Sequence, residues 1–271
     1  MNFLGYLKSF KDKDYDVIKL SDSAFAFIDD ESDFLNIYIK ENVNASFSFS
    51  DLADQGASNV RFTLLEGSKV QLFGLLKDLA PSLNLNIICE KESQIECFFL
   101  DFIENKSKSN IDIELNGEGA KATWRLASLA RNKDNKEFDV TINHNVPNTY
   151  ALSENYGIAK DESRLVFTGV SDIKNGSIGA STRQVAKIVL FDERSKAKSM
   201  PILKISENDI TASHATSVGT LNENEVFYLT SRGISEEMAK NLITLGYFNP
   251  IISRFDEDEQ EEINKLIKER M

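Results

Sequence analysis

The chain has 271 residues, of which 43 are acidic and 31 are basic, so its formal net charge at pH 7 is −12. Apolar residues make up 41% of it, which is enough for a sizeable hydrophobic core. An acidic surface repels phosphate backbones and anionic lipid headgroups, so neither nucleic acid nor a membrane is expected as a partner. The N-terminal stretch is broken by Lys and Asp before any apolar run reaches signal-peptide length, and no later segment approaches a membrane span. We therefore expect a cytoplasmic protein.

From about Tyr15 to Leu221 the sequence is a series of short runs rich in β-branched and aromatic residues, separated by polar turns. Apolar and polar residues alternate in residues 34–39 and 111–115, which predicts strands with one face in a core and one in solvent. The residues before Tyr15 are a candidate helix, and residues 67–82 are another. Many short strands at close spacing are typical of a sandwich, a barrel or a solenoid, and no exact internal repeat chooses among them.

Two cysteines, Cys89 and Cys97, lie among apolar neighbours. A cytosolic setting disfavours a disulfide, and the chain has no Cys-x-x-Cys pair that would suggest a metal site. Because free cysteine is among the most buried residue types, we predict two buried thiols. A role for one of them in holding sulfur or iron is the alternative.

After Leu221 the spacing of apolar residues becomes helical. Asn222 or Asn224 can cap a first helix, and Gly233 can provide its left-handed C-terminal stop. Ser235 is the predicted N-cap of a second helix that ends at Gly246. The predicted apolar face of this second helix consists of Met238, Ala239, Leu242 and Ile243.

A third helix is predicted to begin at Asn249 and Pro250, which are a good N-cap and first-position pair. It carries an apolar stripe that must be buried, made of Ile251, Ile252, Phe255, Ile263, Leu266 and Ile267. The acidic run from Asp256 to Glu262 is expected to be a solvated helix face. The sequence thus divides into a β-rich part over residues 1–221 and a helical part over residues 222–271.

Several motifs occur in an order that is informative as a set. Residues 211–248 contain a strand with Ser-His, a short turn, and a helix with Phe-Tyr-Leu and Ser-Arg-Gly-Ile. Upstream lie a Gly-Glu-Gly-Ala segment in residues 115–132 and a His-x-x-Pro-x-Thr-like segment in residues 142–177. Together these motifs resemble the SufB/SufD family, the scaffold subunits of the SUF iron–sulfur cluster assembly system. The resemblance covers roughly the C-terminal 160 residues, a span over which chance agreement of several ordered motifs is improbable.

This resemblance implies a mainly β fold, a right-handed parallel β-helix in which each strand pairs with the equivalent strand one coil away, followed by a small C-terminal helical domain. SufB-type chains carry a cysteine and an acidic residue at positions that here hold Val185 and Ala215. Since neither side chain can act as a thiolate or carboxylate, the chain looks most like the SufD type. It departs from that type too, because Ala215 follows His214 where the family usually has Gly, and the chain is short for the family.

The family's functional residues map onto two places. His214 would help to hold a transient iron–sulfur cluster at the interface with a SufB-like scaffold, since imidazole is a borderline ligand for iron. Without the resemblance, His214 reads as a histidine that hydrogen-bonds a turn. The segment that binds SufC, the ABC-type ATPase of the system, would include Phe227, Tyr228, Arg232, Gly233 and Ile234. The alternative is that Phe227 and Leu229 pin the helices onto the end of the solenoid.

The predicted function is that of a non-catalytic SufD-like scaffold without a tightly bound cofactor. The chain has no Gly-x-x-x-x-Gly-Lys-Ser/Thr loop, so ATP hydrolysis would belong to SufC. His144 is expected to position a turn, and Trp124 to pack the interior. Two other readings stay open: a self-associating β-helix scaffold that forms a homodimer, and a carbohydrate-active β-helix protein with clustered carboxylates. The residues also leave open whether a flavin binds.

Overall fold

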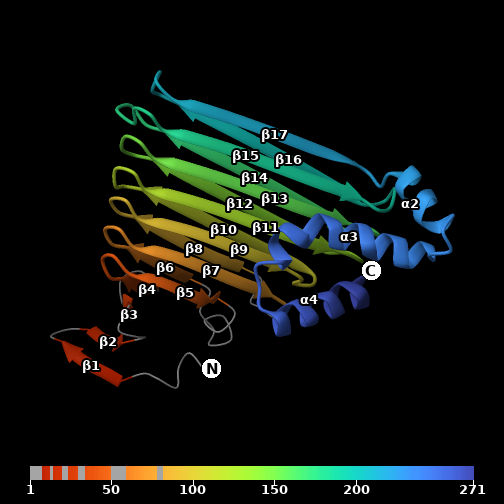
Figure 1. Ribbon diagram of the computed structural model, residues 1–271, viewed down its shortest axis with the longest axis horizontal. Coiled ribbons are helices and arrows are strands. Elements are labelled where there is room, and N and C mark those ends of the chain that lie inside the picture. Colours follow the sequence, from red (N-terminus) through yellow and green to blue (C-terminus); the bar gives the residue numbers. More distant parts are fainter. Residues whose placement is uncertain (1–7, 13–14, 20–23, 30–33, 50–58, 78–81) are drawn as a thin grey trace.

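A computed structural model describes residues 8–12, 15–19, 24–29, 34–49, 59–77 and 82–271 of the protein. In these residues two sheets face each other and form a parallel β-solenoid, and the chain then enters three helices that lie beside it (Figure 1). This architecture confirms the predicted mainly β solenoid fold.

The strands alternate between the two sheets along the chain. In spatial order, the first sheet contains β1 (Lys8–Asp12), β2 (Tyr15–Lys19), β3 (Ala24–Asp29), β4 (Phe34–Ile39), β6 (Asn59–Leu64), β8 (Ser82–Cys89), β10 (Lys106–Leu115), β12 (Asn135–His144), β14 (Arg164–Ile173) and β16 (Lys196–Ile205). The second sheet contains β5 (Asn44–Ser48), β7 (Lys69–Leu76), β9 (Gln94–Asp101), β11 (Lys121–Ala130), β13 (Tyr150–Ala159), β15 (Ser181–Leu190) and β17 (Thr211–Thr220). From β4 onward each strand pairs in parallel with the strand one coil away, whereas β1 to β4 pair antiparallel.

The length of a coil changes along the solenoid. Leu35 of β4 pairs with Val60 of β6, a step of 25 residues, whereas Arg164 of β14 pairs with Lys196 of β16, a step of 32 residues. Because the number of residues per coil changes along the chain, the coils share no fixed period. This explains why the sequence shows no exact internal repeat although the fold is repetitive.

The space between the sheets, which we call the lumen, is filled by the side chains of alternate residues. Ile111, Ile113 and Leu115 are buried there, as their alternation predicts. Trp124 is also buried, with its ring stacked on Phe99 at 4.8 Å between centroids. The prediction that Trp124 packs the interior is therefore confirmed.

Carboxylates stabilise the corners where the second sheet returns to the first. Asn132 and Asp161 occupy the left-handed backbone region, which Asn and Asp tolerate better than other non-glycine residues. The backbone N–H of Asn132 donates to Asp161 Oδ2 at 2.9 Å, and that of Asp161 donates to Asp192 Oδ2 at 2.8 Å. One coil earlier, Asn105 N donates to Asp134 Oδ1 at 2.6 Å. Each acidic side chain thus supports the corner of the coil before it.

The two helices predicted in the β-rich part are not formed in the described residues, which are strands there. Within residues 67–82 the chain forms strand β7, and residues 78–81 lie outside the described residues. Val70 and Leu72 point into the lumen with period two, and a Cβ at Gly74 would come within 2.4 Å of the Phe99 ring. Of the residues before Tyr15, the described ones form strand β1, and residues 1–7 and 13–14 lie outside the description.

The C-terminal helices are α2 (Glu223–Thr230), α3 (Glu236–Ile252) and α4 (Glu257–Arg270). Asn222 caps α2 and Ser235 caps α3, as predicted, each by accepting a hydrogen bond from a backbone N–H of the first turn. Gly233 follows α2 with a φ of 85°, which fits its predicted role as a left-handed stop. The predicted start of the third helix is wrong, because Asp256 caps α4.

Helix α3 continues through Gly246 and Pro250, contrary to the prediction that it ends at Gly246. Pro250 lacks the N–H that would donate to the carbonyl of Gly246, which weakens the last turn. Burial of Ile251 and Ile252 in that same turn offsets the loss.

Helix α3 packs against the outer face of the second sheet, beside β9, β11 and β13, and α4 packs against α3 (Figure 1). Their apolar side chains form a second cluster with strand residues of that face: Leu75, Phe98, Leu100, Phe102, Ala127, Leu129, Ile158, Phe248, Ile251, Ile252, Phe255, Ile263 and Ile267, with Leu266 partly buried beside them. This confirms that the stripe predicted from Ile251 to Ile267 is buried. Most of the acidic run from Asp256 to Glu262 faces solvent, also as predicted.

Candidate functional site

The C-terminal end of the solenoid is open. Strands β16 and β17 are the outermost strands of the two sheets, so each pairs with a single strand among the described residues. The helices do not cover this end, because α3 lies against β9, β11 and β13 (Figure 1). Lumen positions of the last coil are consequently exposed, including the apolar Ile205 and Val218.

His214 lies in this exposed last coil, on β17. It is the register partner of Gln184 on β15, and paired residues of parallel strands point to the same face. Since Gln184 is buried in the lumen, His214 occupies the next lumen position above it, at the open end. The structure therefore places the predicted site residue at a sheet edge, where a second chain can reach it.

The lumen becomes polar below His214. Gln184 Nε2 donates to Ser171 Oγ at 2.8 Å and to the carbonyl of Ile202 at 3.2 Å, and Ser171 Oγ lies 2.9 Å from Thr182 Oγ1. Gln184 Oε1 is buried without a hydrogen-bond partner. Most lumen positions of the earlier coils hold Ile, Leu and Phe, although buried polar groups such as Ser153 and Asn155 also occur there. Sequence alternation alone marks these residues as core and gives no signal that they form one polar group.

Val185 and Ala215, which the resemblance matches to a cysteine and an acidic residue of SufB-type chains, are register partners on β15 and β17. They point away from the lumen, opposite to Gln184 and His214. These two positions thus meet at one spot on the last two strands of the second sheet.

The predicted ATPase-binding residues lie together at the corner between α2 and α3. Phe227 and Tyr228 are 71% and 54% exposed, and the Arg232 guanidinium stacks over the Tyr228 ring at 4.3 Å. Gly233 and Ile234 form the turn into α3. In the alternative, Phe227 and Leu229 pin the helices onto the end of the solenoid; the exposure of Phe227 disagrees with this, whereas Leu229 is half-buried.

Two further apolar side chains extend this surface. Met238 and Leu242 of α3 were expected to be buried with Ala239 and Ile243, but they are 47% and 42% exposed. Helical spacing identifies an apolar stripe but cannot say which part of it the rest of the chain covers. We call Phe227, Tyr228, Met238 and Leu242 the apolar corner.

Neither cysteine is available as a ligand. Cys89 and Cys97 are fully buried in the lumen, as predicted. Burial raises the pKa of the Cys89 thiol to about 12 and that of Cys97 well above its usual range. A thiolate, which is the form that binds metal, is therefore disfavoured at both positions.

His144 is buried at the corner after β12. Its Nδ1 lies 2.8 Å from Thr149 Oγ1 of the same turn, and its backbone carbonyl accepts a hydrogen bond from Ser177 Oγ at 2.7 Å. Burial lowers its pKa to about 4, so the ring is neutral near pH 7. These contacts agree with the predicted structural role for His144.

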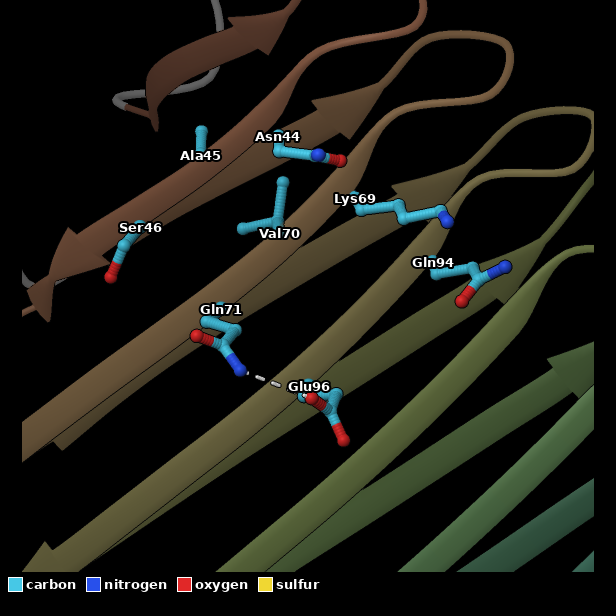
Figure 2. Close-up of a pocket in the computed structure, with 8 residues that line it drawn as sticks. All are labelled: Asn44, Ala45, Ser46, Lys69, Val70, Gln71, Gln94 and Glu96. Atoms are coloured by element: carbon cyan, nitrogen blue, oxygen red, sulfur yellow. Dashed lines mark hydrogen bonds between the residues drawn. The ribbon is translucent and has the colours of Figure 1, made fainter. Parts of the chain in front are cut away.

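Two surface hollows among the described residues, both away from the open end, show no pair of unengaged carboxylates. A hollow of about 460 Å³ over β5, β7 and β9 is lined by one carboxylate, Glu96, which accepts a hydrogen bond from Gln71 at 3.2 Å (Figure 2). A second hollow of about 450 Å³ lies over the corners, where Asp134 and Asp161 already accept backbone hydrogen bonds. Within the described residues, no group of three or more His, Cys, Asp or Glu side chains is arranged to hold a metal. Neither hollow therefore favours the carbohydrate-active reading, which needs a free acid and base pair.

Each helix in the described part of the chain is too short or too polar to cross a bilayer.

Comparison with known proteins gives matches over most of the chain. A family model described as the SufBD core domain of SUF-system iron–sulfur cluster assembly matches residues 35–247. This match begins well upstream of the motifs in residues 115–132, so the first coils also carry the family pattern.

Curated relatives include proteins of both scaffold types. SufD of Bacillus subtilis (strain 168), an iron–sulfur cluster assembly protein, is 28% identical over 163 residues, which cover 60% of this chain and 37% of that protein. SufB of the same strain is 26% identical over 189 residues, covering 68% and 40%. A SufBD family protein of Staphylococcus saprophyticus is 29% identical over 157 residues, covering 58% and 34%. The chain thus matches between about a third and two fifths of the length of these relatives.

Proposed function

Because the chain belongs to the SufBD family of SUF-system iron–sulfur cluster assembly proteins, we propose that it is a SufD-like scaffold subunit. In this proposal it is not itself an enzyme. It pairs with a SufB-like scaffold, binds the SufC ATPase, and contributes to a site where an iron–sulfur cluster is assembled as cargo.

The open end of the solenoid is the observation that carries the proposal. The outer edges of β16 and β17 have backbone N–H and C=O groups that no described strand pairs. Exposed sheet edges are templates for strand addition by another chain. The exposed lumen positions Ile205 and Val218 add apolar surface that a stacked coil would cover. A second β-solenoid joined end to end would satisfy both features.

His214 is the residue of this end with metal-binding chemistry. Its imidazole can ligate iron when neutral, but a cluster also needs thiolate ligands. Cys89 and Cys97 are buried with raised pKa values, so the thiolates would come from the partner scaffold. The division of ligands between two chains agrees with Val185 and Ala215 replacing the SufB-type cysteine and acid.

The apolar corner on α2 and α3 supports ATPase docking. Phe227, the most exposed large apolar side chain among the described residues, lies on a short helix without buried residues. Helix α2 gains little from the solenoid itself, so a partner that covers Phe227 and Tyr228 would stabilise it.

Co-purification with a SufB-type scaffold and a SufC-type ATPase, followed by anaerobic cluster reconstitution, tests the proposal. Phe227→Ala/Tyr228→Ala should lose the ATPase and keep the scaffold. His214→Ala should keep both partners and build less cluster, whereas Ser213→Ala, on the opposite face of β17, should behave as wild type. If the wild-type chain binds neither partner, the proposal is wrong.

The same unpaired edges also favour a second candidate, a homodimer of this chain joined through β16 and β17. Sedimentation of the purified chain separates the two. A stable homodimer that a SufB-type scaffold does not displace would favour self-association.

A further inference from the structure

The groove between the last β corner and the start of α2 and α3 has a strongly acidic lining. We call it the acidic groove; it has a volume of about 540 Å³. Four carboxylates and one ammonium line it, from Asp192, Glu193, Glu223, Glu236 and Lys240. Their formal charges leave the groove with a net charge of −3.

Part of this charge is already engaged within the chain. Asp192 Oδ2 accepts the backbone N–H of Asp161 at 2.8 Å, and Glu236 pairs with Lys240 at 2.8 Å. No hydrogen bond or ion pair links the Glu193 and Glu223 carboxylates to another described residue, and both residues are exposed. Two negative charges of the groove are thus free to meet a partner.

Apolar side chains lie between these carboxylates. Phe191 and Val226 are half-buried in the lining, and the exposed Phe227 belongs to both the acidic groove and the apolar corner. An apolar surface with an acidic rim is complementary to an amphipathic segment that carries Lys or Arg beside apolar residues.

We propose that the acidic groove receives a cationic amphipathic segment of the ATPase partner, with an apolar side chain against Phe227 and basic side chains on Glu193 and Glu223. This inference rests on the proposed function, since it names the chemistry of the partner surface that docks at α2 and α3. Rim charges of this kind act mainly on the association rate, and salt screens them.

The test measures binding of a purified SufC-type ATPase to the full chain by surface plasmon resonance at low and high salt. Glu193→Lys/Glu223→Lys should weaken binding by roughly tenfold at low salt, chiefly through slower association, and by much less at high salt. Glu193→Lys alone should show part of the loss; Glu193 lies outside any helix, so this variant leaves the capping of α2 intact.

Glu257→Lys/Glu261→Lys is the matched control. It makes the same charge change on α4, and Glu257 begins α4 as Glu223 begins α2, so both doubles lose one favourable helix-dipole contact. This control should bind as wild type.

Equal binding of the two double variants, or wild-type binding that does not depend on salt, would overturn the inference. If Phe227→Ala/Tyr228→Ala still loses the ATPase in that case, the proposed docking surface stands and only its charge chemistry is wrong. If all variants bind as wild type, the ATPase docks elsewhere and the proposed function loses its support from α2.

Discussion

The ion pair between Asp101 and Lys136 predicts a large and asymmetric stability effect, because both side chains are fully buried. Lys136 Nζ donates to Asp101 Oδ2 at 2.7 Å and to the carbonyl of Leu129 at 2.8 Å. Ser128 Oγ donates to the same carboxylate oxygen at 2.7 Å. The pair links the end of β9 to β11 and β12, close to the cluster on which α3 and α4 pack.

Lys136→Met should lower the free energy of unfolding by about 3–5 kcal/mol, because it leaves an unpaired carboxylate in the interior. Asp101→Leu should lower the free energy of unfolding by a similar amount, since it leaves the Lys136 ammonium unpaired. The double variant Asp101→Leu/Lys136→Met removes both charges, and the groups that lose a hydrogen-bond partner are all neutral: Ser128 Oγ, the Ile103 N–H and the Leu129 carbonyl. It should therefore cost about 1–3 kcal/mol, less than either single variant.

Urea unfolding followed by circular dichroism and by fluorescence of the single Trp124 measures this cycle. The unfolding slopes of the four proteins should agree, which shows that the native and unfolded states are comparable. The reasoning is refuted if Lys136→Met costs less than about 1 kcal/mol, or if the cost of the double variant equals the sum of the two singles.

Three further predictions concern close packing, pH and capping. Gly117→Ala should lower the free energy of unfolding in urea by about 3 kcal/mol or more, because the new Cβ would lie 1.8 Å from Lys91 N. Gly246→Ala should not lower it, because no atom lies within 4 Å of a Cβ at that position. Equal effects of the two substitutions would contradict this. The pKa of His144 falls from 6.5 to about 4 on folding, so between these pH values the unfolded chain binds a proton at His144 that the folded chain does not. The free energy of unfolding should therefore fall by about 3 kcal/mol as the pH is lowered from 6.5 toward 4. In the His144→Gln variant the free energy of unfolding should depend less on pH over this range. A variant that keeps the full slope would exclude His144 as its source. Asn222→Ala removes the side chain that accepts the Asn224 N–H at 3.1 Å, which should lower the stability of α2 by about 1 kcal/mol. Hydrogen exchange of the α2 amides should then be about fivefold faster, while exchange in α4 stays unchanged. Unchanged exchange in α2 would rule out the cap.

Local chemistry was sufficient for the features that depend on a few neighbouring residues. The caps at Asn222 and Ser235 follow from side-chain acceptors placed just before a helical pattern, and the inward face of residues 111–115 follows from alternation. The end of α3 did not follow, because burial of Ile251 and Ile252 in a distant cluster outweighs the local signal of Pro250.

The candidate site depends on register between strands about thirty residues apart, which no local pattern encodes. The resemblance could single out His214, but only the pairing with Gln184 places it at an open sheet edge above a polar lumen. Likewise, the sequence marks Met238 and Leu242 as apolar helix positions, while their exposure follows from where α3 rests on the second sheet.

Hydrogen–deuterium exchange of the chain, alone and in complex with a SufB-type scaffold and a SufC-type ATPase, tests the central claim most directly. The account predicts that the scaffold slows exchange in β16 and β17, that the ATPase slows it in α2 and the first turns of α3, and that β9 and β11 are unaffected. Binding of both partners without added protection in β17 or α2 would contradict it.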